Sequence, residues 1–221
     1  MNPSKADPTR GASTRASRRS RRKHGTLSRA DIVDAGLALA AEVGFESINI
    51  RALSVRLDCS PMAIYTHVDG KEDLLQAMAD RAIDMIKLPE FQGDWVGWYI
   101  DVALSYWSMM CRYPGIDAYI LTRGPVIASP SSIAVTTRMF DVLLKAGFGP
   151  ETAATVWRTT HTYLSGYAML ARSASYASQD HYTTQAADVE RVFAELNRPV
   201  DESILESDLR QILSAFAKPL L

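Results

Sequence analysis

The sequence contains few cysteines and no long hydrophobic run. Of its 221 residues only two are cysteines, Cys59 and Cys111, and neither belongs to a CxxC or Cys/His pattern, so neither a disulfide framework nor a zinc site is expected. No apolar run approaches the roughly 18 residues that a membrane-spanning helix needs. The arginine-rich N-terminus also lacks the apolar core of a signal peptide. We therefore expect a cytoplasmic protein with no metal, no other cofactor and no contact with a membrane.

Catalytic motifs are missing as well. Ser165, in the stretch LSGY, has no flanking glycines of a nucleophile elbow, and Arg123-Gly124-Pro125 does not form a phosphate-binding loop. We find no nucleophile beside a base and no pair of carboxylates with suitable spacing. An enzyme is therefore the least favoured function, and we predict no catalytic residue.

Charge is distributed unevenly along the chain, although the net charge is only -1. Residues 1–25 carry eight Lys or Arg residues and one Asp, a net charge of +7, whereas the remainder carries 16 basic and 24 acidic residues, a net charge of -8. The basic segment has almost no large apolar residue, so burial cannot offset its ordering entropy and we expect it to be disordered. It is either a solvated leader, or a mis-assigned start, or an arm that adds phosphate contacts on nucleic acid.

Apolar residues recur at helical spacing along most of the chain, and no segment sustains the two-residue alternation of a strand. Ser28 and Asp31 form an approximate capping box, while Asn49 and Ser60 can cap two further helices. With 47% hydrophobic residues the chain can build a substantial core. We predict an all-α protein with helices over 27–44, 49–58, 60–68, 71–87, 95–112, 115–122, 131–146, 150–173, 187–196 and 202–217.

The second and third predicted helices are short and closely connected, as in a helix-turn-helix. The second carries the apolar residues Leu53, Val55 and Leu57. The third should pack Ile64 against Leu53, Leu57 and Val68 and present its other face. In this motif the second helix enters the major groove and its first residues meet base edges. Tyr65 and His67 can donate to phosphates, as can Lys71 with the free backbone N–H groups of the next helix. The candidate DNA-binding residues are Arg51, Ser60, Pro61, Met62, Ala63, Tyr65, Thr66, His67 and Lys71.

Residues 29–75 resemble the DNA-binding domain of the TetR/AcrR family of bacterial transcriptional repressors. The stretch IYTHVDGKEDLL is the most specific part of the match. Two positions differ from the family pattern, since Asp58 stands at the usual turn glycine and Asn49-Ile50 replaces the commoner Thr-hydrophobic pair. The matching residues are Ala35, Leu39, Gly44, Phe45, Ile50-Arg51-Ala52-Leu53, Leu57, Ser60, Ile64-Tyr65, His67-Val68, Lys71 and Leu74-Leu75.

The resemblance implies a two-domain, all-helical dimer whose C-terminal domain binds a small molecule and thereby alters DNA affinity. The stretch LLKAGFGPETAATVWRTTHTYLSGYAML is similar to a dimerisation segment of the tetracycline-repressor branch. The drug-sensing residues are absent, because Met110–Gly115 lacks the expected magnesium-binding His and Met169-Leu170-Ala171 lacks the acidic ligand. A tetracycline–magnesium complex is therefore not the expected effector.

Aromatic and methionine residues are frequent in the C-terminal part. Such residues usually fill a core, but together they also indicate a pocket with adaptable walls. His161 is either an ordinary core histidine or a polar anchor in a cavity. For His67 and Cys59, phosphate contact or packing is favoured over a metal. The candidate ligand-binding residues are Met85, Trp107, Met110, Trp157, His161 and Tyr167.

These features predict a ligand-responsive transcriptional regulator, and specifically a repressor. We expect it to bind a palindromic operator on double-stranded DNA as a homodimer and to be released by a small apolar or aromatic effector. The alternative is a constitutive, sequence-tolerant DNA-binding protein that uses its basic arm. The expected parts are a basic arm (1–25), a helix-turn-helix domain (26–70) and a helical ligand-binding and dimerisation domain (71–221), with helices around 150–171 and 202–217 forming the dimer.

Overall fold

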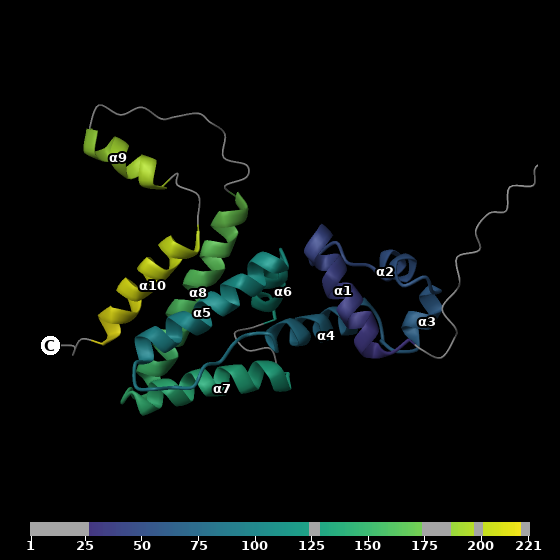
Figure 1. Ribbon diagram of the computed structural model, residues 1–221, viewed down its shortest axis with the longest axis horizontal. Helices are drawn as coiled ribbons and strands as arrows, with labels where there is room; N and C mark the ends of the chain where they lie inside the picture. The colour runs from purple at the N-terminus through teal and green to yellow at the C-terminus, as the bar shows by residue number, and fades with distance from the viewer. Residues whose placement is uncertain (1–26, 124–128, 174–186, 197–200, 218–221) are drawn as a thin grey trace, which may run out of the picture.

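The computed structural model describes residues 27–123, 129–173, 187–196 and 201–217. Within these ranges the secondary structure is helical and contains no strand, which confirms the predicted all-α class (Figure 1). The basic arm, 1–25, lies outside the described residues. The helices are α1 (Arg29–Val43), α2 (Ile50–Arg56), α3 (Pro61–Tyr65), α4 (Lys71–Ile83), α5 (Trp95–Arg112), α6 (Ile116–Leu121), α7 (Pro130–Lys145), α8 (Pro150–Ser173), α9 (Ala187–Leu196) and α10 (Glu202–Phe216).

Helix α1 begins and ends where its sequence signals predict. Ser28 accepts a hydrogen bond from the Asp31 amide while Asp31 accepts one from the Ser28 amide, which completes the capping box. Gly44 ends the helix with φ 85°, a conformation that residues with a Cβ rarely adopt. The helix packs closely on α4, because a Cβ at Gly36 would lie 2.7 Å from Sδ of Met78.

Helices α2 and α3 are each capped by a polar side chain. Asn49 accepts a 2.8 Å hydrogen bond from Ala52 N, and Ser60 accepts a 3.2 Å bond from Ala63 N. Of the apolar residues of α2, Val55 is 77% exposed. Leu53 and Leu57 are one helical turn apart and both buried, so a residue midway between them points to solvent.

Helix α4 is shorter than predicted, since it ends at Ile83 and not at Lys87. After it the chain tightens into i to i+3 turns, in which Met85 N and Ile86 N donate to the carbonyls of Ala82 and Ile83. Lys87 N then donates a 2.8 Å bond to Ser105 Oγ of α5, which holds the segment in place. Ile86 therefore stays buried although it lies beyond the helix.

The remaining helices build a second cluster around α5. Figure 1 shows α1, α2 and α3 grouped at one end of the molecule, with α4 leading from them towards α5, α7 and α8. Helix α5 contacts α4, α7, α8 and α10. Tyr99 and Ile100 of α5 and Leu143 of α7 are fully buried in this cluster. None of the helices in the described ranges is both long enough and apolar enough to cross a bilayer.

Candidate nucleic-acid interface and internal pocket

Helix α3 has one buried and one exposed face, as a groove-reading helix requires. Ile64 is fully buried, whereas Met62 is 73% and Tyr65 50% exposed. Ile64 therefore anchors α3 to the core, while Met62 and Tyr65 leave its other side accessible to a partner. Of the candidate residues on and around α3, Ser60, Pro61, Met62, Tyr65 and Thr66 are exposed and Ala63 and His67 are half-buried.

The turn before α3 has a left-handed residue. Asp58 adopts φ 52°, and it is the sole non-glycine residue with a positive φ in the described part of the chain. Asp tolerates this conformation better than most residues because its short polar side chain can bond locally. The substitution of the family's turn glycine thus leaves a glycine-like backbone in place.

The two candidate cations, Arg51 and Lys71, are both exposed. Arg51 lies on α2, and Lys71 is the first residue of α4, where Gly70 provides no side-chain cap. The Nζ of Lys71 lies 3.4 Å from the carbonyl of Glu46, which uses one of its three N–H donors. The other two donors are available to a phosphate.

An ion pair between α1 and α4 was not anticipated from the sequence. Arg29 contacts both carboxylate oxygens of Asp73, at 2.6 and 2.7 Å, and also donates a 2.7 Å bond to the carbonyl of His67. Asp73 accepts a further bond from Asp69 N. The Arg29 guanidinium lowers the pKa of Asp73 to about 2. These bonds hold the end of the α3 turn against the start of α1 and α4.

A second unanticipated cluster joins α4 to α6. Glu72 accepts a 3.0 Å hydrogen bond from the Tyr119 hydroxyl and pairs with Arg123, whose guanidinium carbon lies 3.5 Å from the Tyr119 ring centroid. Arg123 thereby lowers the pKa of Glu72. On its other side the Tyr119 ring packs on Phe45, with centroids 5.1 Å apart, and Phe45 N donates a 2.7 Å bond to the Pro114 carbonyl. Helix α6 and the turn before it therefore contact the α1–α2 connection directly.

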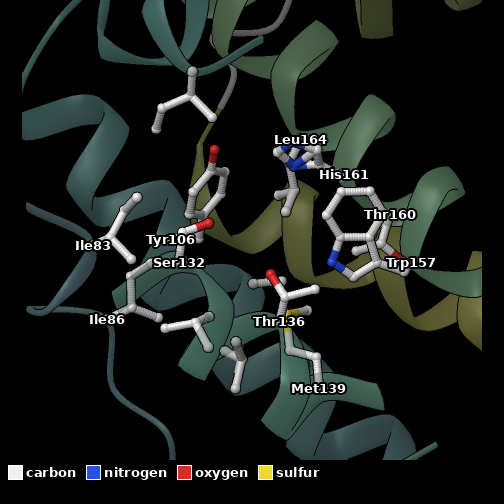
Figure 2. A pocket seen from close by; sticks show the side chains of 14 residues that line it. Ile83, Ile86, Tyr106, Ser132, Thr136, Met139, Trp157, Thr160, His161 and Leu164 are labelled. Carbon is white, nitrogen blue, oxygen red and sulfur yellow. The ribbon is translucent and has the colours of Figure 1, made fainter. Parts of the chain in front are cut away.

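An internal pocket of about 70 Å³ lies where the end of α4 meets α5, α6, α7 and α8 (Figure 2). Figure 2 shows Tyr106 on one side of it and His161 and Trp157 on the other, with Thr136 and Met139 of α7 below. None of the lining side chains carries a full charge at neutral pH, since burial lowers the pKa of His161. The lining residues are Ile83, Ile86, Val102, Ala103, Tyr106, Ile120, Ser132, Val135, Thr136, Met139, Trp157, Thr160, His161 and Leu164.

Two of the six candidate ligand-binding residues, Trp157 and His161, line this pocket, and four do not. Trp107 and Tyr167 pack against each other with centroids 5.2 Å apart, and the Tyr167 hydroxyl donates to the Asp201 carbonyl before α10. Met110 is buried elsewhere in the core, and Met85 is 42% exposed in the turn after α4. The other lining residues were not candidates; among them is the aromatic Tyr106, which lies next to the candidate Trp107 in the sequence.

Two polar atoms at the pocket are enclosed without a hydrogen-bond partner in the structure, the Tyr106 hydroxyl and Nε2 of His161. The two rings are neighbours, with centroids 5.6 Å apart, and Trp157 covers the far side of His161 at 4.8 Å. Burial raises the pKa of Tyr106, and the nearby Asp117 carboxylate adds to this. Both groups are therefore neutral hydrogen-bonding groups in an apolar surrounding.

Metal ligands do not converge in the described ranges, in which no three His, Cys, Asp or Glu residues could hold an ion together. Cys59 is half-buried beside the α2–α3 turn, and burial raises the pKa of its thiol. A raised thiol pKa is typical of a packed cysteine and not of a reactive or metal-binding one.

The short α2, the tight turn and the exposed α3 are the arrangement of a helix-turn-helix DNA-binding regulator. Residues 32–78 match the family model described as bacterial regulatory proteins, tetR family. The chain is 30% identical over 156 residues to the class G tetracycline repressor protein of Vibrio anguillarum, which covers 69% of this chain and 72% of that protein. The protein belongs to the TetR family of transcriptional regulators, and it is a DNA-binding protein and not an enzyme.

Other relatives and solved structures agree with this assignment. An HTH-type transcriptional repressor of Mycobacterium tuberculosis is 26% identical over 166 residues, which cover 72% of this chain and 63% of that protein. A possible TetR family regulator from Streptomyces coelicolor superimposes with a TM-score of 0.72 at 20% identity, covering 86% of this chain and 98% of the other. The actinorhodin complex of ActR from the same species gives a TM-score of 0.69 at 18% identity, over 87% and 98%. These structures establish the shared fold.

Proposed function

We propose that the protein is a ligand-responsive repressor that binds a palindromic operator as a homodimer and is released when a small molecule occupies the internal pocket. The observation that carries this proposal is the course of α4. Its first residue, Lys71, adjoins the exposed α3 region, and its last residue, Ile83, lines the pocket together with Ile86. A ligand that displaces Ile83 and Ile86 therefore acts on the same rigid element that supports the DNA-binding face.

The proposed DNA contacts divide into base-reading and phosphate-binding groups. The start of α3, from Ser60 to Ala63, meets base edges, with the exposed Met62 at its centre. Tyr65, Thr66 and His67 follow the phosphate backbone. Arg51 and Lys71 supply the cations, and the basic arm of residues 1–25 adds sequence-independent phosphate contacts. In this proposal residues 26–70 form the DNA-binding domain and residues 71–221 form the ligand-binding and dimerisation domain.

A homodimer through α8 and α10 is supported by the surface of α8. Met169 and Leu170 near its C-terminal end are 65% and 62% exposed, although both are large apolar residues. The opposite face of α8 packs on α5, α7 and α10, so the helix is apolar on more than one side. Burying the exposed side against a second copy would remove this apolar surface from water.

A displacement caused by a ligand in the pocket can be transmitted to the DNA-binding face through two helices. One is α4 itself, and the other is α6, in which Ile120 lines the pocket while its neighbour Tyr119 bonds to Glu72 and packs on Phe45. A ligand needs to favour the DNA-incompetent state by only roughly 1 to 3 kcal/mol to act as a switch. Solved relatives have been captured with actinorhodin and with minocycline, which supports the idea of a ligand-binding pocket in this fold.

Binding-site selection with the full-length protein tests the proposal. We expect an enriched palindrome whose half-sites are spaced by about 10 base pairs or a multiple, as two symmetric recognition helices require. A small-molecule screen on that operator should then find compounds that release the protein, and saturating operator should weaken their binding by the same factor. Enrichment of no sequence, with strongly salt-dependent binding, would favour the constitutive DNA-binding alternative. Ligand affinities that are identical with and without operator would refute the coupling.

A further inference from the structure

The chemistry of the pocket restricts the ligand more narrowly than its general apolar character does. Most of the wall is aliphatic, formed by residues such as Ile83, Val102 and Leu164, and among the described residues no Asp, Glu, Lys or Arg lines it. A charged ligand would lose its hydration without gaining a counter-ion. The acidic Asp117, buried near Tyr106, makes the site still less favourable for an anion.

The pocket also contains two buried polar atoms without a hydrogen-bond partner in the structure, the Tyr106 hydroxyl and Nε2 of His161. A buried donor or acceptor that remains unpaired is costly, and in most proteins such groups find a partner. In Figure 2 both groups lie at the same end of the pocket, away from Thr136 and Met139. A ligand whose polar group reaches this end gains hydrogen bonds that the protein does not otherwise make.

The type of hydrogen bond follows from the two groups. A tyrosine hydroxyl donates one bond and accepts others, and Nε2 of a neutral imidazole acts as either donor or acceptor. A ligand hydroxyl matches both, because it can accept from Tyr106 and donate to His161. The rings of Trp157 and His161, tilted by 34° with centroids 4.8 Å apart, provide an aromatic surface for a ligand ring.

The size of the cavity indicates a small ligand. Its volume of about 70 Å³ is below the roughly 150 Å³ of an apolar cavity known to hold benzene and far below the roughly 300 Å³ or more of sites for drug-sized compounds. One ring can be admitted if the flexible Met139, half-buried at the α7 side, changes rotamer. Met139 lines the same pocket as Ile83 at the end of α4.

We propose that the pocket binds an uncharged, single-ring hydroxyarene, a simple phenol, whose hydroxyl bonds to Tyr106 and His161 while its ring occupies the apolar part. The inference rests on the proposed function only in taking this pocket to be the effector site. It differs from a general preference for apolar molecules in requiring the hydroxyl, and from an acid-binding site in excluding a carboxylate.

Three probes that share the ring and methyl group of toluene test it, namely toluene itself, p-cresol and 4-methylbenzoate. In calorimetric titrations of the full-length protein without DNA, p-cresol should bind roughly tenfold more tightly than toluene, which corresponds to one or two buried hydrogen bonds. The carboxylate should bind more weakly than p-cresol by at least a similar factor. Equal affinities for p-cresol and toluene, tighter binding of the carboxylate, or no binding of any probe would each overturn the proposal.

Variants connect the preference to the two residues. Tyr106→Phe should reduce the p-cresol to toluene affinity ratio to about threefold or less and leave toluene binding nearly unchanged, and His161→Leu should act in the same direction. Tyr99→Phe is the matched control, because the Tyr99 hydroxyl is also buried and unpartnered but does not line the pocket. If His161→Leu does not fold, the comparison of Tyr106→Phe with Tyr99→Phe still decides. A ratio that Tyr106→Phe leaves intact would refute the assignment.

The test of the phenol preference and the test of the ligand-responsive repressor can fail independently. Titration without DNA measures only which ligand the pocket prefers, so a phenol preference can be found even where no operator is released. Release of operator by toluene and p-cresol alike, at equal affinity, would support the ligand-responsive repressor and overturn the hydroxyl requirement.

Discussion

The Tyr119 hydroxyl donates a 3.0 Å hydrogen bond to Glu72, so a residue on α6 is bonded to the second residue of α4. The next residue along α6, Ile120, lines the internal pocket. Two consecutive side chains on a short helix therefore face the pocket and the DNA-binding end of the molecule. A displacement of α6 by a ligand would strain the contacts of Tyr119 with Glu72 and Phe45.

Removing this connection should weaken the coupling between ligand and operator without removing either binding site. We expect Tyr119→Phe combined with Arg123→Gln to reduce the factor by which a pocket ligand lowers operator affinity, by roughly threefold to tenfold. Ligand affinity without DNA should change little. Operator titrations with and without ligand provide the measurement.

The matched control is Arg56→Gln. It breaks the exposed ion pair between Arg56 of α2 and Glu42 of α1, whose charged atoms lie 2.8 Å apart. Neither residue lines the pocket. It should leave the coupling factor unchanged. Coupling that survives loss of Tyr119 and Arg123 in full would show that α4 alone transmits the signal.

Replacing the left-handed turn residue should stabilise the protein. Asp58→Gly relieves the cost of a Cβ at φ 52°. The greater freedom of glycine in the unfolded chain offsets part of this effect, so we expect the free energy of unfolding to rise by up to about 1 kcal/mol. Asp58→Ala keeps the Cβ and loses the polar group, so it should give no gain. Urea denaturation of the three proteins measures the difference. A loss of stability in the glycine variant would mean that the Asp58 side chain contributes more than its backbone conformation costs.

Individual helices were largely predictable from the sequence because their signals are local. Ser28, Asn49 and Ser60 each cap the helix that they precede, and most helix bounds agree within two residues. The C-terminal ends of α3 and α4 differ more. Helix α3 ends at Tyr65 and not at Val68, and the apolar spacing of α4 continues to Ile86 while Lys87 N already bonds to Ser105 of α5. That hydrogen bond joins residues distant in sequence and has no local signal.

The pocket was less predictable because it depends on which face of each helix meets which neighbour. Tyr106 and Trp107 are adjacent aromatic residues, yet one faces the pocket and the other packs on Tyr167. On α8 the spacing of Trp157, Thr160, His161 and Leu164 marks one face, and Tyr163 and Tyr167 mark another that bonds to Asp208 and to the Asp201 carbonyl. The i, i+3, i+4 and i+7 spacing of the first four residues is typical of one helix face, but tertiary contacts decide which neighbour that face meets. The Arg29–Asp73 pair spans 44 residues and likewise has no sequence signal.

The Arg29–Asp73 pair should make stability depend on acidic pH. The pKa of Asp73 is lowered to about 2 in the folded protein from 3.8, so the stabilisation is fully present above about pH 4 and is lost as the pH falls towards about 2. Because both side chains are partly exposed, at 46% and 31%, the pair should contribute no more than about 1 kcal/mol. A double-mutant cycle with Arg29→Met and Asp73→Asn isolates it. We expect the coupling energy to shrink between about pH 6 and about pH 3, and a constant value would contradict the pairing.

Salt dependence should separate the phosphate-binding residues from those that read bases. If Lys71 contacts a phosphate, Lys71→Ala should weaken operator and random DNA alike and lower the slope of log affinity against log salt concentration by about 0.9. Met62→Ala, at a 73% exposed position of α3, should leave the slope unchanged and alter which bases are preferred. Binding titrations at several salt concentrations, combined with site selection, measure both effects.

The contact between Lys71 and the Glu46 carbonyl provides a competing explanation that the same experiment can distinguish. At 3.4 Å this contact is weak, but if its role is only to hold the α1–α2 connection, Lys71→Ala should lower stability and affinity while the salt slope stays as in the parent protein. A lowered slope at unchanged unfolding free energy supports the phosphate contact. An unchanged slope, or a changed base preference, would exclude Lys71 from the phosphate-binding group and leave Arg51 and the basic arm to supply the cations, since neutralising a phosphate is what releases counterions.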